Sequence, residues 1–441
     1  MPNESVKSVA DVTRLLEKTQ KGLPCSTIDN AAIVFREDPL FAGNLRWNLF
    51  RNRIELLGKM PWNRTGTYVT DSDEIHIRHY FETKYHISTD KKINDAMMIV
   101  ANENAYHPVR EYLKGLSWDG TERIRFVLHH FLGSEVNDFV EESTRLFLLG
   151  AISRIFKPGC KFEYMLCLVG GQGAGKSSFI RFLSCFDEWF CDDIKRLDED
   201  KVYEHFDGHW ILEIAEMLAL NNAKCNEATK AFLSRQRDNY RLPYGKRAED
   251  NPRQCVFAGT SNLVNFLPND RSGNRRFLPI MCDAAKAEVH ILENEAESRK
   301  YIEQVWAEAM VIYNAGNVKL KLSNEIEKSL ADYQEPFMQE DTFEVVIRNY
   351  LDNYTGDKVC IMQLMEEALN IPWQKKGYEK AAVAEIMNRM PGWEHFSNPR
   401  HFGIKYGRQK GYARVTTVSD NQVVQNNFVQ LSIEDNPFET Q

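Results

Sequence analysis

The residues with the clearest chemical signature form a glycine-rich stretch, "LVGGQGAGKSS", in which an apolar run ends at Val169. Residues 170–177 match the pattern GxxxxGK followed by Ser or Thr without a mismatch. Glycines let successive backbone N–H groups turn towards phosphates, and a helix that begins after the loop favours an anion at its amino terminus. Lys176 offers a charge to the β and γ phosphates, and the Ser177 hydroxyl is available to Mg²⁺. The expected nucleoside triphosphate contacts come from Gly170, Gly171, Gln172, Gly173, Ala174, Gly175, Lys176, Ser177 and Ser178.

A second predicted strand supplies carboxylates to this site. Residues 210–214 form an apolar run that is interrupted by Glu213 and followed by Glu216. A carboxylate inside such a run is costly to bury unless it faces a cation. We assign Glu213 to Mg²⁺ or its water shell and Glu216 to the general base that polarises the attacking water, with an exchange of the two roles as the alternative. An exposed place at a strand end is the structural alternative for either glutamate.

A third predicted strand, residues 254–262, ends at Asn262. An amide at this point can hold the attacking water and sense the γ phosphate, although an ordinary strand-to-loop transition has the same composition. Arg271, Arg275 and Arg276 follow closely. Guanidinium groups stabilise phosphoryl-transfer charge across a subunit boundary, so Arg275 and Arg276 are candidate catalytic residues. Surface ion pairs and DNA phosphate contacts are the alternatives, and the choice between the two arginines stays open.

The elements that position these residues alternate between strand and helix from about residue 159 to 320, which predicts an α/β fold with a mainly parallel sheet. The flanking segments differ in pattern and are expected to form separate parts. The predicted regions are a mixed α+β N-terminal accessory region (1–115), a helical linker or collar (116–158), the P-loop ATPase domain (159–320), a small C-terminal winged-helix-like domain (340–418) and a mobile acidic tail (419–441).

Composition limits the classes of protein to which the chain can belong and its expected location in the cell. The 441-residue chain has a formal net charge of −8, which argues against a surface coated in positive charge but leaves room for a local basic stripe. It has no run of about eighteen apolar residues and no basic-then-apolar start, so we expect no membrane span, no signal peptide and a cytoplasmic location. The nine cysteines are scattered without a CxxC pair, which indicates reduced thiols rather than a zinc site.

A basic segment between the second and third predicted strands is a candidate DNA contact. Residues 229–253 hold seven Lys or Arg against three Asp or Glu in a chain that is acidic overall. Tyr244 is suited to stack on a base, and Lys246 and Arg247 to contact phosphates. A solvated helix and loop is the alternative, because most runs of charged residues lie on a solvent-exposed surface.

A second basic segment lies near the carboxyl terminus. Residues 398–414 contain Lys405, Arg408 and Lys410 among aromatic residues, with no acidic residue. A preceding helical pattern followed by a basic hairpin predicts a winged-helix module that contacts duplex or origin DNA. A plain packing domain is the alternative.

The order of these motifs resembles the superfamily-three helicases, a branch of the AAA+ ATPases found in viruses and mobile elements. Over about residues 30–320 the chain more narrowly resembles the virulence-associated protein E family of phage and pathogenicity-island proteins. The stretches that carry this resemblance are "YHPVREYL…WDG", "GGQGAGKSS", "KAFLSRQRDNYRLPYG" and "GNRRFLPI".

The resemblance implies a ring ATPase, expected to be hexameric, that uses ATP and Mg²⁺. Asn262 would match the sensor position, and Arg275 or Arg276 the finger that acts on a neighbour's ATP. In related helicases the interval that corresponds to residues 229–253 carries a hairpin that lines the central pore. Many relatives also carry an N-terminal primase-type domain, but residues 1–115 show no primase carboxylate constellation. Primer synthesis is therefore not expected of this chain, and a primase or other replication protein is an expected partner.

The sequence thus favours an ATP-driven DNA helicase or translocase of phage or mobile-element replication, with single-stranded DNA in the pore of a homo-oligomeric ring. A non-translocating AAA+ initiator or loader that binds DNA under ATP control shares every motif and is the alternative. A small-molecule kinase is disfavoured because no lid segment with paired phosphate-gripping arginines lies close to the glycine-rich loop.

Overall fold

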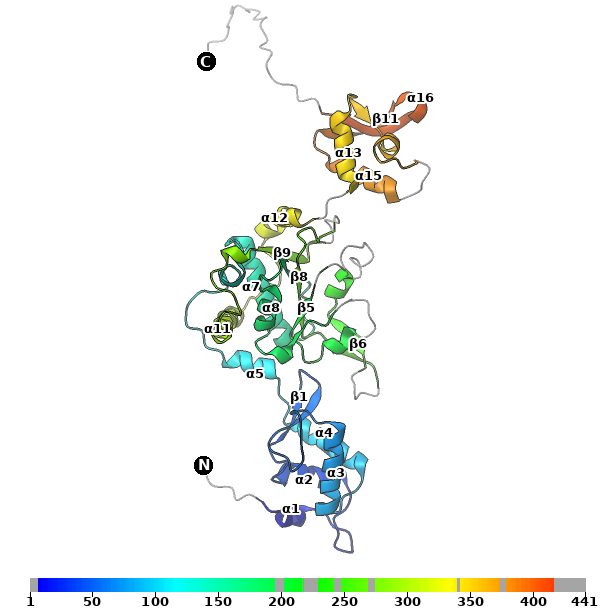
Figure 1. Cartoon of the computed structure of the whole chain (residues 1–441). Coiled ribbons are helices and arrows are strands. Elements are labelled where there is room, and N and C mark those ends of the chain that lie inside the picture. Colours follow the sequence, from blue (N-terminus) through cyan, green and yellow to red (C-terminus); the bar gives the residue numbers. More distant parts are fainter. Residues whose placement is uncertain are drawn as a thin grey trace, which may run out of the picture. The chain divides into compact units, whose positions relative to one another are not determined.

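The structure is a computed structural model that describes residues 7–194, 202–215, 217, 229–241, 247–268, 274–338, 342–372 and 378–415. The chain divides into two compact units, Met1–Gln339 and Glu340–Gln441 (Figure 1). Three residues that the sequence assigns to sites, Glu216, Tyr244 and Lys246, lie outside the described residues, and so does the predicted tail 419–441.

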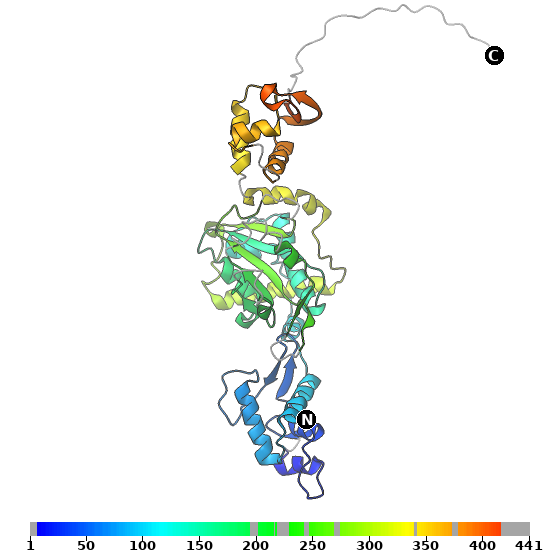
Figure 2. The ribbon, with the colours of Figure 1, turned by 90° about the vertical axis from the view of Figure 1, so that its right-hand side faces the viewer.

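A five-stranded sheet forms the centre of the first unit, and every adjacent pair of its strands is parallel. The strands lie side by side in Figure 2. In sheet order they are β4 (Phe190–Cys191), β5 (Ile211–Ile214), β8 (Val256–Ser261), β3 (Met165–Gly170) and β9 (Phe277–Cys282). This arrangement confirms the predicted α/β class with a parallel sheet.

Both faces of the sheet are covered, and β3 shows why its sequence reads as one apolar run. Leu166 and Leu168 belong to one hydrophobic cluster, whereas Met165, Cys167 and Val169 belong to another. Successive side chains of a strand point to opposite faces, so a strand covered on both sides is apolar at every position.

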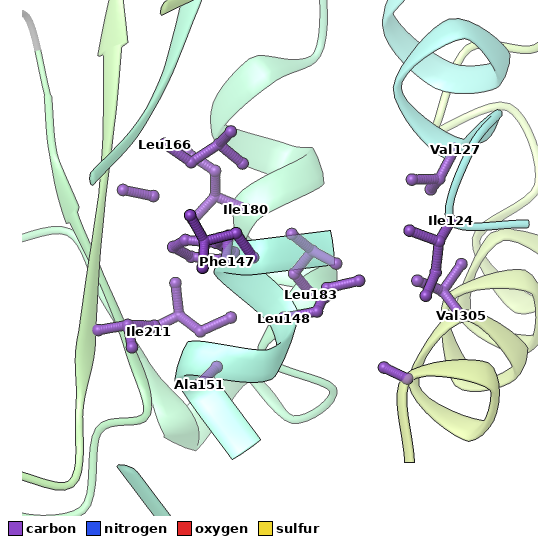
Figure 3. Packing of buried hydrophobic residues seen from close by; sticks show 14 of the residues in the cluster. Ile124, Val127, Phe147, Leu148, Ala151, Leu166, Ile180, Leu183, Ile211 and Val305 are labelled. Carbon is purple, nitrogen blue, oxygen red and sulfur yellow. The ribbon is translucent and has the colours of Figure 1, made fainter. Parts of the chain in front are cut away.

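Helices α7 (Asp138–Phe156), α8 (Lys176–Leu183) and α11 (Glu295–Asn314) pack in the first of these clusters. Figure 3 shows Phe147 and Leu148 of α7 beside Ile180 and Leu183 of α8, close to Leu166 of the sheet. Helix α8 is therefore held against the sheet by its apolar face, which fixes the loop that precedes it. The elements that complete this part of the unit are α5 (Pro108–Gly115), α6 (Val127–Leu132), α12 (Asn324–Gln334) and the hairpin of β6 (Arg237–Tyr240) and β7 (Glu249–Pro252).

The first hundred residues form a mixed α+β region with a hydrophobic cluster of their own. Two antiparallel strands, β1 and β2, are joined by a short turn that contacts the sheet domain: the Gly208 N–H donates to the Phe50 carbonyl at 2.9 Å. Gly208 has φ +81°, and a Cβ there would meet the Arg51 side chain at 2.1 Å, so only glycine fits this contact. The elements are α1 (Val9–Leu15), α2 (Ile28–Glu37), β1 (Leu45–Asn48), β2 (Arg53–Leu56), α3 (Asp71–Tyr85) and α4 (Asp90–Glu103).

The second unit packs helices against a three-stranded antiparallel sheet around its own core. Helices that precede a hairpin are the arrangement expected from the sequence, and the assignment to the winged-helix class stays a prediction. The elements are α13 (Thr342–Asn353), β10 (Lys358–Val359), α14 (Ile361–Gln363), a π-helical turn (Leu364–Ala368), α15 (Tyr378–Arg389), β11 (Trp393–His401), α16 (Gly403–Tyr406) and β12 (Arg408–Arg414). Across both units, none of the described helices is long and apolar enough to cross a membrane.

Candidate functional site

The glycine-rich loop joins the end of β3 to the start of α8, at the carboxyl edge of the parallel sheet. Gly173 and Gly175 have φ of +82° and +79°, a backbone conformation that favours glycine. A Cβ on Gly170 would lie 2.3 Å from the carbonyl oxygen of Cys282 on β9. Glycine is thus required at 170 by close packing of two strands, and at 175 by the turn into the helix.

Lys176 lies at the first position of α8 with its ammonium group inside the loop. The side chain is only 6% exposed, and Nζ donates to the carbonyl oxygens of Gly170 and Gly171, each at 2.7 Å. Nζ also donates to Oδ1 of Asn262 at 3.1 Å. The fold therefore brings together Lys176 and Asn262, which are 86 positions apart in the sequence.

Glu213 lies on β5 beside the same loop and is 1% exposed. Its Oε1 accepts hydrogen bonds from the Ser177 hydroxyl at 2.7 Å and from the Thr260 hydroxyl at 2.6 Å. Burial raises the pKa of the Glu213 carboxyl, and the two hydroxyl donors oppose that rise by stabilising the charged form. The residues predicted to serve Mg²⁺, Ser177 and Glu213, are thus in direct contact.

The oxygen atoms of Ser177 and Glu213 fit Mg²⁺, which is a hard cation. This ion usually takes one or two protein ligands and completes its shell with waters and substrate phosphates. Within the described part of the chain, no group of three or more His, Cys, Asp or Glu side chains could hold a metal ion. A site of this small size is suited to a metal that arrives with a phosphate ligand.

A cavity of about 330 Å³ opens over Lys176, Ser177 and Asn262, and Thr260, a partner of Glu213, also lines it. Its position outside the carboxyl ends of β3, β5 and β8 is the place where parallel α/β sheets bind ligands. The lining consists of Gln172, Gly173, Ala174, Gly175, Lys176, Ser177, Ser178, Ala215, Thr260, Ser261, Asn262, His290 and Leu292.

Thr260 and His290 are among the lining residues that had no role in the sequence interpretation. Thr260 sits in a buried strand, where its hydroxyl gave no local signal, because its partner Glu213 comes from another strand. His290 follows β9 in a segment without a motif, and its Nε2 lies 3.4 Å from the carbonyl oxygen of Gly173. Only tertiary structure brings either residue to the cavity.

Arg275 and Arg276 lie far from this cavity in their own chain. Both directly precede β9, and the register pairs Met165 with Phe277 and Gly170 with Cys282. Six residues of strand at about 3.3 Å each therefore place the arginines about 20 Å from the glycine-rich loop, at the amino edge of the sheet. Neither arginine is among the residues that line the 330 Å³ cavity.

The two arginines differ in their surroundings. Nε of Arg276 donates to the Ser234 hydroxyl at 3.0 Å and lies 3.3 Å from Oε2 of Glu163. Arg275 is exposed, and both arginines line a separate cavity of about 1020 Å³ at the amino edge of the sheet. Arg276 is thus engaged within its chain, whereas Arg275 projects from it.

The basic segment 229–253 contributes less surface charge than its composition suggests. Arg253 is 3% exposed, its Nη2 donates to Asp238 at 2.9 Å, and its guanidinium lies 4.4 Å from the centre of the Phe232 ring. Lys230 is 5% exposed. Arg253 stabilises the base of the β6–β7 hairpin through Asp238, whereas Arg247, predicted to contact DNA, is exposed beside β7.

The three basic residues predicted to contact DNA near the carboxyl terminus all lie in the second unit. Nζ of Lys405 forms an ion pair with Glu366 at 2.9 Å. Arg408 and Lys410 are exposed on β12, and Nη2 of Arg408 donates weakly to the Pro399 carbonyl at 3.4 Å. Arg408 and Lys410 are thus open to solvent, whereas Lys405 is tied to the helical part of the unit.

Comparison with solved structures finds similar chains that share little sequence identity. The structure titled "The apo structure of NrS-1 C terminal region (305-718)" is 15% identical, with a TM-score of 0.45, and the match covers 84% of this chain and 95% of that one. A second, "The A form apo structure of NrS-1 C terminal region-CTR", is 14% identical, with a TM-score of 0.46, and covers 84% and 96%. No curated protein matches the chain.

Comparison with family models gives a match to the virulence-associated protein E-like domain over residues 113–339. The matched range is just over half of the chain. It contains the glycine-rich loop, Glu213, Asn262 and both arginines. The chain belongs to the virulence-associated protein E-like family.

Proposed function

We propose that this protein is a Mg²⁺-dependent ATPase that drives translocation along DNA, and the unwinding of DNA, during replication of a phage or mobile element. The observation that carries the proposal is the contact set at the carboxyl edge of the sheet. There Ser177 and Thr260 donate to Glu213, and Lys176 donates to Asn262, around one cavity. This set combines a cation for phosphates with oxygen ligands for a metal, which are the groups that phosphoryl transfer needs.

In this proposal the loop and the helix terminus hold the phosphates of ATP. Lys176 exchanges its present contacts with the loop carbonyls for the β and γ phosphate oxygens, because a phosphate is the stronger acceptor for an ammonium. Ser177 and Glu213 would hold Mg²⁺, which would neutralise charge that develops on the phosphates. Thr260 keeps the Glu213 carboxylate oriented towards Ser177.

In this proposal, Asn262 and Glu216 act on the attacking water. Asn262 is oriented by its hydrogen bond to Lys176, so a change in the phosphate contacts of Lys176 also changes the freedom of Asn262. Glu216 is the residue next to Ala215, which lines the cavity. A carboxylate at this point can act as the general base, and Asn262 can position the water and sense the γ phosphate.

The distance of the arginines from their own glycine-rich loop supports, in this proposal, a ring of subunits. An arginine finger must reach the phosphates of an ATP, but Arg275 lies at the edge of the sheet opposite its own glycine-rich loop. In a ring, the amino edge of one subunit can meet the carboxyl edge of the next, which would deliver Arg275 to the neighbour's ATP. Arg276 is the weaker candidate, because Glu163 and Ser234 already hold its guanidinium.

The non-translocating initiator or loader remains the second candidate function. The exposed basic hairpin of the second unit favours it, since a fixed DNA-binding surface serves site recognition more directly than movement. Both candidates require ATP binding at the same loop, and they differ in whether hydrolysis moves a DNA strand.

Unwinding of a forked DNA duplex tests the proposal. The wild-type protein is expected to separate the strands only with Mg²⁺ and ATP, and Lys176→Ala to be inactive in both hydrolysis and unwinding. The double variant Lys246→Ala/Arg247→Ala is expected to hydrolyse ATP but not to unwind, while Lys328→Ala, at an exposed position of α12, serves as a matched control. DNA-stimulated hydrolysis without unwinding by the wild type would select the initiator function, and no ATP hydrolysis at all would refute both.

A further inference from the structure

The tip of the β11–β12 hairpin in the second unit is an ordered loop, held by backbone hydrogen bonds and aromatic packing. The Phe402 N–H donates to the Gly407 carbonyl at 2.8 Å, and the Gly407 N–H donates to the Gly403 carbonyl at 3.0 Å. The rings of Phe402 and Tyr406 are each 9% exposed and pack in a small cluster with Cys360. These contacts anchor α16, the single helical turn at the tip (Figure 1).

The same contacts direct Ile404 into solvent. Phe402 and Tyr406 point inward on either side of it, and Ile404 is left fully exposed, at 102%. The other large apolar residues that are exposed in the described part of the chain are 39% to 58% exposed. A single exposed apolar side chain is common on protein surfaces. Full exposure at the apex of an anchored turn is a different case, because the fold presents this side chain and none of the described residues of the unit covers it.

Cationic side chains lie on both faces of the hairpin. Opposed residues of an antiparallel pair share a face, and alternate residues of one strand share a face. Arg408, Lys410 and the opposed His401 therefore lie on one face, and Arg400, opposed to Gln409, lies on the other. The guanidinium of Arg400 is 4.2 Å from the centre of the Phe396 ring.

The hairpin itself carries little acidic charge, although Glu366 and Glu367 of the helical part contact its tip through Lys405 and Tyr406. Residues 393–415 contain one acidic residue, Glu394, which lies at the base of the hairpin opposite Ala413. Glu366, in the helical part of the unit, pairs with Lys405 at the tip. Arg400, Arg408 and Lys410, nearer the base, have no acidic partner on the hairpin. The hairpin is thus a positively charged ribbon with an apolar apex.

We propose that this hairpin enters a groove of duplex DNA and inserts Ile404 between adjacent base pairs. The inference rests on the proposed function in one respect, that the protein acts on DNA. A groove has a phosphate backbone on each side, so cations on both faces of a ribbon match a duplex. A single strand offers one line of phosphates and needs cations on one face only. Apolar side chains that enter a base step unstack it and kink the duplex.

The cations of the hairpin and Ile404 contribute to binding in different ways. Arg400 on one face, and Arg408 and Lys410 on the other, contact phosphates of the two strands and fix the depth of the tip. Ile404 has no packing against the described residues to lose when it enters DNA, and it gains contact with base faces. The anchored turn reduces the loss of conformational freedom on insertion. A hairpin of this kind would open the first base pair ahead of a translocating ring or bend an origin.

Fluorescence of 2-aminopurine placed in a duplex tests the insertion in the full-length protein, together with fluorescence anisotropy for affinity. Wild-type protein is expected to raise the fluorescence, which reports unstacking. Ile404→Ser is expected to abolish this rise and weaken duplex binding by about tenfold or more, from the loss of one buried aliphatic side chain. Ile404→Leu should retain both properties. Ile75→Ser, at a 58% exposed position on α3, is the matched control and should match the wild type.

The outcomes separate this inference from the proposed function. Equal 2-aminopurine fluorescence and equal duplex affinity for Ile404→Ser and wild type would overturn the insertion, even if ATP-dependent unwinding is normal. A fluorescence rise with single-stranded DNA but none with duplex would also overturn it. Arg400→Gln and Lys410→Gln should each reduce the slope of log affinity against log salt concentration by about 1. Unchanged slopes would show that the two faces of the hairpin do not contact phosphates. Failure of the proposed function would appear instead as no DNA-stimulated ATP hydrolysis by the wild type.

Discussion

Replacement of Glu213 by glutamine separates the proposed metal chemistry of the site from its folding. The side chain is 1% exposed, and its Oε1 accepts from the hydroxyls of Ser177 and Thr260. Glutamine has nearly the same size, and its amide oxygen can accept from both hydroxyls. The substitution therefore removes the negative charge while leaving the shape of the site and its two hydrogen bonds.

The expected effect on stability is small because two contributions oppose each other. Hydrogen bonds to a charged acceptor contribute about 1 kcal/mol more than those to a neutral one, so two such bonds lose about 2 kcal/mol. Removal of a buried charge offsets this loss. The net change in the free energy of unfolding should stay within about 1 kcal/mol. Glu213→Ala instead leaves the buried Thr260 hydroxyl without its acceptor and should cost about 1–3 kcal/mol.

The pH dependence has a definite sign. Burial raises the pKa of Glu213 in the folded protein, so its contribution to stability is fully present below the pKa of the unfolded chain. That contribution is lost as the pH rises through the higher folded pKa. Without Mg²⁺, the unfolding temperature of the wild type should therefore fall relative to that of Glu213→Gln as the pH rises from acid to neutral. Mg²⁺ with ATP should narrow the difference by stabilising the charged form.

The effect on hydrolysis should be much larger than the effect on folding. Loss of a metal carboxylate removes several kcal/mol of charge stabilisation, which corresponds to a decrease in kcat of about 100-fold or more. Steady-state ATP hydrolysis across a Mg²⁺ titration, with thermal unfolding of the same samples, measures both quantities. Hydrolysis by Glu213→Gln at the wild-type rate and with the wild-type Mg²⁺ dependence would refute the assignment of Glu213 to the metal.

Three further predictions concern residues around the site. Thr260→Val should lower kcat about tenfold with little change in ATP affinity, because it removes a hydroxyl that orients Glu213. In steady-state kinetics, an unchanged kcat or a large loss of ATP affinity would contradict this prediction. When Arg275→Ala subunits are mixed with wild-type subunits, ATPase activity should fall by more than the fraction of variant subunits. A fall in activity that is linear in that fraction would contradict an arginine finger that acts on the neighbouring subunit. Arg253→Gln should destabilise the fold by about 3–5 kcal/mol in urea unfolding by breaking a buried ion pair, and Arg247→Gln at an exposed position should change it by less than about 0.5 kcal/mol.

The sequence was sufficient to predict the elements around the loop, because their signals are local. Glycine spacing defines the turn between β3 and α8, and unbroken apolar runs identify strands covered on both faces. Glu213 was predictable for a related reason. A charged residue within a buried strand needs partners, and the structure supplies Ser177 and Thr260.

Other features depend on tertiary contacts that leave no local pattern. Arg253 reads as one cation in a basic run, but its partner Asp238 stands 15 positions away on the other strand of a hairpin. His290 reaches the cavity only because the segment after β9 returns across the loop. The sequence also contains no sign that Arg276 rather than Arg275 is held within the chain, because its partner Glu163 precedes it by more than a hundred positions. In each case, pairing across the fold decides the role of a residue whose type alone fits several roles.

Isothermal titration calorimetry with Mg²⁺ and a slowly hydrolysed ATP analogue tests the central claim most directly. The claim is that Lys176, Ser177 and Glu213 hold one nucleotide with its metal ion. The wild type should bind one nucleotide per chain. Lys176→Ala should bind at least about tenfold more weakly, from the loss of a charge-assisted contact. Ser177→Ala should lose the Mg²⁺ dependence of binding. Wild-type affinity and wild-type Mg²⁺ dependence in both variants would contradict the account.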